Sequence, residues 1–127
     1  MGILSKIFTW WDGATIGTLL YSARKGKSVG EDSLGNRYYT SADGARRWVI
    51  YNGVNDASRV PPEWHGWLHH THDELPDALP PVRPWQAEPT PNLTGTAAAY
   101  RPAGALERGG RRAAATGDYQ AWTPDGA

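Results

Sequence analysis

Large apolar and aromatic residues are concentrated in the first part of this chain, and this contrast limits what the chain can fold into. Residues 1–75 hold 25 of them, whereas residues 76–127 hold eight in 52, together with eight of the ten prolines. A segment so poor in apolar area gains too little from burial to offset the conformational entropy lost on ordering. We therefore expect a small folded unit at residues 1–75. Residues 76–127 are expected to form a Pro-, Ala- and Gly-rich extended arm that becomes ordered on partners.

The composition of the whole chain narrows the class of function. With 18 Val, Ile and Leu residues and one Phe in 127, the core must rest on Trp and Tyr. A core of this size leaves little room for a reaction pocket, so we predict that the protein is not an enzyme. The 13 Lys and Arg balance the 13 Asp and Glu, which argues against binding to nucleic acid through bulk charge. The absence of Cys excludes disulfides and iron–sulfur ligation by thiolates.

Periodicity and turn residues predict a small, irregular α+β fold. Apolar residues at helical spacing indicate an N-terminal amphipathic helix over residues 3–12. Strand-forming residues separated by turn signals then indicate a three-stranded antiparallel meander. Its strands are expected at residues 28–30, 37–40 and 46–51. Pro61 and Pro62 are typical of a helix start, and they predict a short Trp-rich helix that reaches about Thr71.

Four stretches are more specific than their periodicity. They are TWWDGATIGT at residues 9–18, KSVGEDSLGNRYY at 27–39, RRWVIYNG at 46–53 and VPPEWHGWLHH at 60–70. Each alone is weak, but together, in this order and spacing, they are hard to obtain by chance. They resemble the accessory subunit family of respiratory complex I called NADH:ubiquinone oxidoreductase alpha-subcomplex subunit twelve. The resemblance covers roughly residues 7–70, and we expect a bacterial member.

The resemblance implies a non-catalytic accessory subunit of complex I, NADH:quinone oxidoreductase. Its expected place is the peripheral arm, on the cytoplasmic face of the bacterial inner membrane and on the matrix side in the mitochondrial equivalents. It implies no cofactor, because electron transfer belongs to neighbouring core subunits. Core subunits of the peripheral arm are therefore the expected partners, and neither nucleic acid nor a homo-oligomer is expected. Lys6 and Asp12 interrupt the apolar N-terminal residues, so we also expect no direct membrane insertion.

A small folded unit with a long arm can bridge two neighbours, so we expect this chain to stabilise or assemble the peripheral arm. Large aromatic residues concentrate binding energy at interfaces. Partner contacts are predicted at Ile7, Phe8, Trp10, Trp11, Tyr38, Tyr39, Arg47, Trp64, His65 and Trp85. The alternative for Trp48, Trp64 and Trp67 is that they form the protein's own core.

Two other patterns leave different functions open. His65, His69 and His72 fall on one helical face, a spacing that permits a zinc or nickel site. The alternative is surface or partner-facing histidines, and we predict no metal. Residues 108–112, RGGRR, resemble one copy of an RNA-binding segment, although a solvated or partner-facing patch explains them more simply. The alternatives to a resident subunit are therefore a transient complex I assembly factor and a free metal- or RNA-binding module.

The adjacent carboxylates Glu31 and Asp32 are not expected to act as a catalytic pair. Neighbours in sequence usually diverge in space, and a pair of acid and base groups needs a pocket. Turn formation, or a salt bridge to Arg37 or Arg46, is the expected role.

Overall fold

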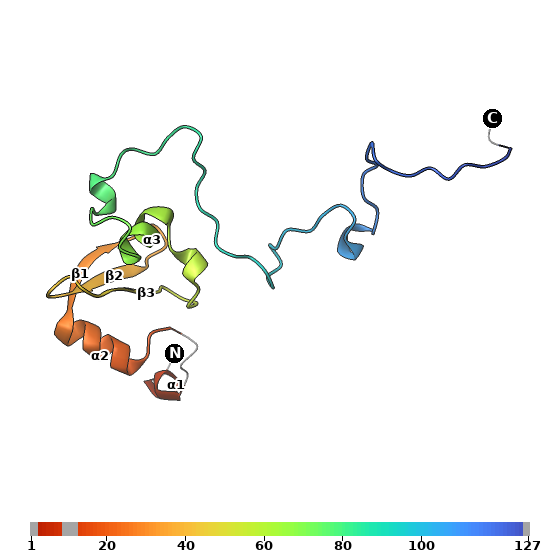
Figure 1. The fold of residues 1–127 in the computed structure, drawn as a ribbon. Helices are drawn as coiled ribbons and strands as arrows, with labels where there is room; N and C mark the ends of the chain where they lie inside the picture. The colour runs from red at the N-terminus through yellow and green to blue at the C-terminus, as the bar shows by residue number, and fades with distance from the viewer. Residues whose placement is uncertain (1–2, 9–12, 126–127) are drawn as a thin grey trace. The chain divides into compact units, whose positions relative to one another are not determined.

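The structure is a computed structural model that describes residues 3–8 and 13–125. It divides the chain into two units, Met1–Asn92 and Leu93–Ala127. The first unit contains the helices α1 (Ile3–Phe8), α2 (Ile16–Lys25) and α3 (Pro62–Leu68), and the strands β1 (Gly26–Glu31), β2 (Arg37–Ser41) and β3 (Arg47–Ile50) (Figure 1). The predicted class is confirmed: a small α+β fold with an N-terminal helix, a three-stranded antiparallel sheet, a short helix and an extended C-terminal region. The predicted continuation of the first helix over residues 9–12 lies outside the described residues.

The sheet has the order β1-β2-β3, as the turn signals predict. Tyr38 pairs with Val49, and Tyr39 pairs with Trp48. Because successive side chains of a strand point to opposite faces, the first pair faces one side of the sheet and the second pair faces the other. Figure 1 shows α3 on one side of the sheet and α2 on the other. A helix therefore packs against each face of this small sheet.

A β-bulge at Val29 changes the register of β1. Ser28 pairs with Tyr39, and Gly30 pairs with Tyr38, which leaves Val29 as the extra residue. A Cβ atom added to Gly30 would lie 2.9 Å from the Trp64 ring. Glycine at this position therefore allows the indole to lie directly against the sheet.

The core lies between the sheet and α3, and it is mainly aromatic. Tyr38 is 0% exposed, Trp67 3% and Trp64 7%. The Tyr38 and Trp64 rings are stacked, with centroids 3.9 Å apart and an interplanar angle of 5°, and Trp67 meets Trp64 edge-on at 5.5 Å. Val60 is also buried in this cluster. The interpretation of Trp64 and Trp67 as core residues is therefore confirmed.

The Asp32 carboxylate organises the turn between β1 and β2. Its Oδ1 accepts hydrogen bonds from the backbone N–H groups of Leu34, at 2.8 Å, and Asn36, at 3.0 Å. Its Oδ2 accepts from Asn36 Nδ2 at 2.8 Å and from the Tyr38 hydroxyl at 2.7 Å. Asn36 is fully buried, and its Oδ1 accepts from the backbone N–H of Asn52 at 3.0 Å. Of the two roles expected for Asp32, the structure shows turn formation.

The ionisation of the Tyr38 hydroxyl is expected to make the free energy of unfolding depend on pH in the alkaline range. Burial, and then its hydrogen bond to the Asp32 carboxylate, raise the pKa of the Tyr38 hydroxyl far above its ordinary value of 10.0. Well below pH 10.0 both the folded and the unfolded state keep this proton. Above it the unfolded state loses the proton while the folded state keeps it, so the stabilisation is lost as pH rises. We expect the free energy of unfolding to fall between pH 9.5 and 11.5, roughly, and less steeply in Tyr38→Phe. Urea denaturation across this range measures it, and equal slopes in the two proteins would contradict the assignment.

Helix α2 is absent from the sequence prediction, and this is a correction. The Thr15 side chain caps it by accepting from the backbone N–H of Thr18 at 3.3 Å. Its buried Ser22 accepts a hydrogen bond from Trp48 Nε1 at 2.9 Å. Gly17 lowers the helical propensity of residues 16–25. The contact between Ser22 and Trp48 therefore provides stability that the local sequence alone does not give the helix.

The second unit, Leu93–Ala127, contains the short 3-10 helix η3 (Leu106–Arg108). A similar turn, η2 (Pro76–Ala78), belongs to the first unit. The sequence analysis placed a boundary between residues 75 and 76, on the ground that residues 1–75 fold by themselves and residues 76–127 do not. This difference in independent folding stays a prediction.

Candidate interaction surface

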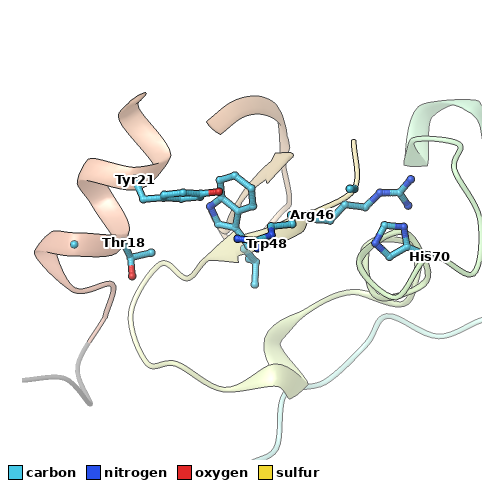
Figure 2. Close-up of a pocket in the computed structure, with 9 residues that line it drawn as sticks. Thr18, Tyr21, Arg46, Trp48 and His70 are labelled. Atoms are coloured by element: carbon cyan, nitrogen blue, oxygen red, sulfur yellow. The ribbon is translucent and has the colours of Figure 1, made fainter. Parts of the chain in front are cut away.

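A groove of about 620 Å³ runs along the start of β3, from α2 to the residues that follow α3. Figure 2 shows Thr18 and Tyr21 of α2 at one end and His70 at the other, with Arg46 and Trp48 between them. The groove therefore joins three segments: α2, the start of β3, and the residues that follow α3.

Aromatic rings form the part of the groove next to α2. The Tyr21 and Trp48 ring centroids are 5.5 Å apart, and the Tyr39 ring stacks with Trp48 at 6.0 Å with an interplanar angle of 12°. Tyr21 remains 41% exposed, and Trp48 is half-buried. Gly26 permits the close approach of Trp48, because an added Cβ would lie 2.8 Å from its ring. Exposed, well-positioned aromatic side chains of this kind are suited to apolar contacts with another molecule.

His70 stands at the end of α3 in a backbone conformation that glycine usually occupies. Its N–H donates to the Trp67 carbonyl at 3.2 Å, and the Thr71 N–H donates to the Gly66 carbonyl at 2.9 Å, which is the Schellman pattern of a helix C-terminus. The φ of His70 is 55°, the only positive φ among the described residues other than glycine. This left-handed conformation costs a residue with a Cβ on the order of 1 kcal/mol. It also ends α3 at Leu68, before the predicted end near Thr71.

Arg47 also lines the groove, but its side chain packs on Trp67 and is almost fully engaged within the chain. Its side chain is 10% exposed, and Nη1 donates to the carbonyls of Trp67 at 2.7 Å and His72 at 3.1 Å. Its guanidinium lies 4.9 Å from the centroid of the Trp67 ring and forms an ion pair with Asp73. The hydrogen bond and the charge of Arg47 hold the pKa of the Asp73 carboxyl below its usual value. Arg47 therefore fastens the segment after α3 to the sheet.

Removal of the Arg47 side chain should destabilise the folded state. We expect Arg47→Ala to lower the free energy of unfolding by about 2 kcal/mol, because two carbonyl groups lose their donor and Trp67 loses a cation–π contact. Asp73→Asn keeps both carbonyl hydrogen bonds and changes a carboxylate that is 86% exposed, so its effect should be much smaller. Urea denaturation followed by circular dichroism compares the two variants. Equal losses would show that the exposed ion pair, rather than the carbonyl contacts, carries the stabilisation.

The structure separates the residues predicted to contact partners into exposed and enclosed groups. Ile7, Phe8 and Trp85 are 55%, 75% and 80% exposed, and His65 is exposed as well. Those enclosed or partly enclosed by the first unit are Tyr38, Tyr39, Arg47 and Trp64. Trp10 and Trp11 lie outside the described residues. The partner contacts themselves stay a prediction for all ten.

The histidines of the predicted cluster lie in two settings. The His65 and His69 rings are stacked, with centroids 4.0 Å apart, and His69 Nδ1 lies 2.8 Å from the His65 carbonyl oxygen. His72 Nδ1 instead lies 3.0 Å from the Glu74 carbonyl oxygen. Within the part of the chain that the structure describes, no group of three His, Cys, Asp or Glu side chains is placed to hold a metal ion.

The C-terminal region presents aromatic side chains to solvent. In the second unit they are Tyr100, Tyr119 and Trp122, which are 80–88% exposed. Arg101 and Glu107 form one ion pair in this unit, and Arg112 and Asp118 form another.

None of the helices within residues 3–8 and 13–125 has the length and apolar character that crossing a bilayer requires.

Tyr21, Arg46 and His70 belong to the groove but were not among the predicted partner-binding residues. His70 carried no sequence signal for this role, because the predicted helix runs past it to about Thr71 and only the structure shows the helix ending at Leu68. Tyr21 carried no signal, because its helix was not predicted. A small α+β unit with an open aromatic groove and an extended, aromatic-bearing C-terminal region has the features of an interaction protein.

Comparison with known proteins identifies the family. The model of the family described as NADH ubiquinone oxidoreductase subunit NDUFA12 matches residues 26–124. The chain therefore belongs to the NDUFA12 family, and the predicted resemblance is confirmed.

Individual relatives agree with this assignment. The chain is 42% identical over 96 residues to NADH dehydrogenase (ubiquinone) 1 alpha subcomplex subunit 12 of Dictyostelium discoideum, covering 69% of this chain and 70% of that protein. It is 44% identical over 94 residues to the bovine protein of the same name, covering 62% and 64%. An uncharacterized protein of Rickettsia prowazekii is 41% identical over 64 residues, covering 46% of this chain and 63% of that protein. A relative of this chain is therefore present in a bacterium.

Proposed function

We propose that this chain is a non-catalytic accessory subunit of respiratory complex I, NADH:quinone oxidoreductase. In this proposal it stabilises or assembles the peripheral arm by bridging core subunits, on the cytoplasmic face of the bacterial inner membrane. The family match over residues 26–124 is the observation that carries the proposal, because related chains from distant organisms bear the name of a complex I subunit.

The form of the molecule supports a role in contacts between subunits. Within residues 3–8 and 13–125, five apolar or aromatic residues form the buried core, whereas large apolar side chains remain exposed on α1, on α2 and along the C-terminal region. Exposed aromatic residues such as Trp85 and Trp122 lose water-accessible area only when another surface covers them. A chain of this kind gains stability on binding, which suits a structural subunit that holds two neighbours together and itself transfers no electrons.

The test is affinity purification of the tagged full-length chain from gently solubilised membranes of its native host. Mass spectrometry identifies the recovered proteins, and NADH:quinone oxidoreductase activity is assayed on the same fraction. The full set of complex I subunits with activity is the expected result. A partial, inactive set of subunits would indicate that the chain is a transient assembly factor and not a resident subunit. Recovery of neither would reject the proposal in favour of a free metal- or RNA-binding module.

A further inference from the structure

His70 occupies its position at a cost that glycine would avoid. The Schellman pattern after α3 requires a left-handed residue, and a glycine there would close the helix with the same two backbone hydrogen bonds. Among the described residues, the His70 side chain forms no hydrogen bond with this cap, and its interaction with Asp73 lowers the pKa of that carboxyl less than Arg47 does. The His70 side chain lines the groove instead (Figure 2), where an imidazole presents an N–H donor in either protonation state. A residue held in an unfavourable conformation beside a groove is a sign of binding.

Arg46 gives the same end of the groove a positive charge that the described chain does not neutralise. Unlike Arg47, the exposed Arg46 forms no ion pair with any carboxylate among residues 3–8 and 13–125. Asp43 is the nearby carboxylate whose pKa is lowered, first by hydrogen bonds from Ser41 and Ala45 and to a lesser extent by the charge of Arg46. Among the described residues, no Asp or Glu lines the groove. A carboxylate of another molecule can therefore pair with Arg46 without meeting a like charge in the lining of the groove.

We infer that the groove binds a segment of a neighbouring complex I subunit in which an acidic residue lies close to an apolar one. The carboxylate binds between Arg46 and His70, and the apolar side chain packs on Trp48 and Tyr21. A guanidinium and an imidazole N–H together match the two oxygens of a carboxylate, while the partly exposed rings of Tyr21 and Trp48 supply the apolar contact area. This inference rests on the proposed function, because the partner is taken to be another subunit of the complex.

Two groove variants and one matched control test the inference in the full-length chain. Arg46→Glu reverses the unmatched charge, and His70→Gly removes the imidazole while keeping a residue suited to the left-handed conformation. Arg24→Glu reverses an exposed charge on α2 outside the groove. Recovery of complex I subunits with each tagged variant is compared with that of the wild type. We expect recovery to fall about tenfold or more for both groove variants and to stay near the wild-type level for Arg24→Glu.

His70→Gly separates binding from folding. Its thermal unfolding midpoint should not be lowered, since glycine is the preferred residue at this cap, although recovery of the complex falls. Unchanged recovery with both groove variants, while the wild type still recovers complex I, would overturn the inference and leave the proposed function intact. If the wild type recovers no complex I subunits, the proposed function fails, and the inference fails with it.

A cross-link identifies the occupant. A photoreactive benzoylphenylalanine in place of Thr18, which lines the groove, should form a covalent link to a peptide of another subunit that contains Asp or Glu beside an apolar residue. Arg46→Glu should abolish this link. A link to a peptide without a carboxylate, to a second copy of this chain, to RNA or to lipid would contradict the inferred occupant.

Discussion

Trp64→Ala is expected to lower the free energy of unfolding by about 3–5 kcal/mol, which is comparable with the whole stability of a domain this small. The indole is 7% exposed, stacks on Tyr38 at 3.9 Å and meets Trp67 edge-on. Its removal opens a cavity above Gly30, where no side chain is present to fill the space. Most of the variant should therefore be unfolded at about 37 °C. Loss of near-ultraviolet circular dichroism and of dispersed NMR resonances measures this unfolding.

Trp85→Ala is the matched control, because it removes the same side chain from a site that is 80% exposed. We expect its free energy of unfolding to stay within about 0.5 kcal/mol of the wild type. Similar denaturation midpoints for the two variants would contradict the placement of Trp64 in the core. Full-length protein should be used in both cases, so that the C-terminal region contributes equally.

Asp32→Ala is expected to have the second-largest effect, a loss of about 3 kcal/mol. Four donors lose one carboxylate acceptor: the backbone N–H groups of Leu34 and Asn36, Asn36 Nδ2, and the Tyr38 hydroxyl. Asn36 and Tyr38 are 0% exposed, so water cannot readily replace the lost acceptor. Urea denaturation at neutral pH measures the loss.

A double-mutant cycle with Tyr38→Phe isolates one of these contacts. Phenylalanine removes the hydroxyl that Asp32→Ala leaves without a partner, so the double variant should lose less stability than the sum of the two single changes. The expected difference is about 1 kcal/mol or more. Strict additivity would mean that the hydrogen bond between Asp32 and Tyr38 contributes nothing measurable.

The strands and the last helix could be predicted because their signals are local. The stretch of residues 46–51 is rich in β-branched and aromatic residues and ends at a turn pair, and β3 is found within it at Arg47–Ile50. Pro62 stands at the start of α3 as expected. The end of α3 was placed too late, because a left-handed histidine is a less obvious stop than a glycine.

Other features depended on contacts that are distant in sequence. Helix α2 is stabilised by packing on Trp48, 26 residues after Ser22, and no local pattern reports this contact. Tyr38 and Tyr39 are neighbours with similar sequence signals, yet the first is fully buried under α3 and the second lies on the α2 face. Deciding which tyrosine belongs to the core requires knowing which helix covers which face. The groove could not be predicted for the same reason, since three separate segments form it.

The bulge in β1 also bears on self-association. β1 and β3 are the two edges of the sheet, and an edge strand offers unpaired backbone groups to any other strand, including one from a second copy of the chain. The extra residue at Val29 bends one edge, and the other edge is only four residues long. Both features make strand addition unfavourable. A bent edge and a short edge both disfavour a continuous sheet between two copies of the chain.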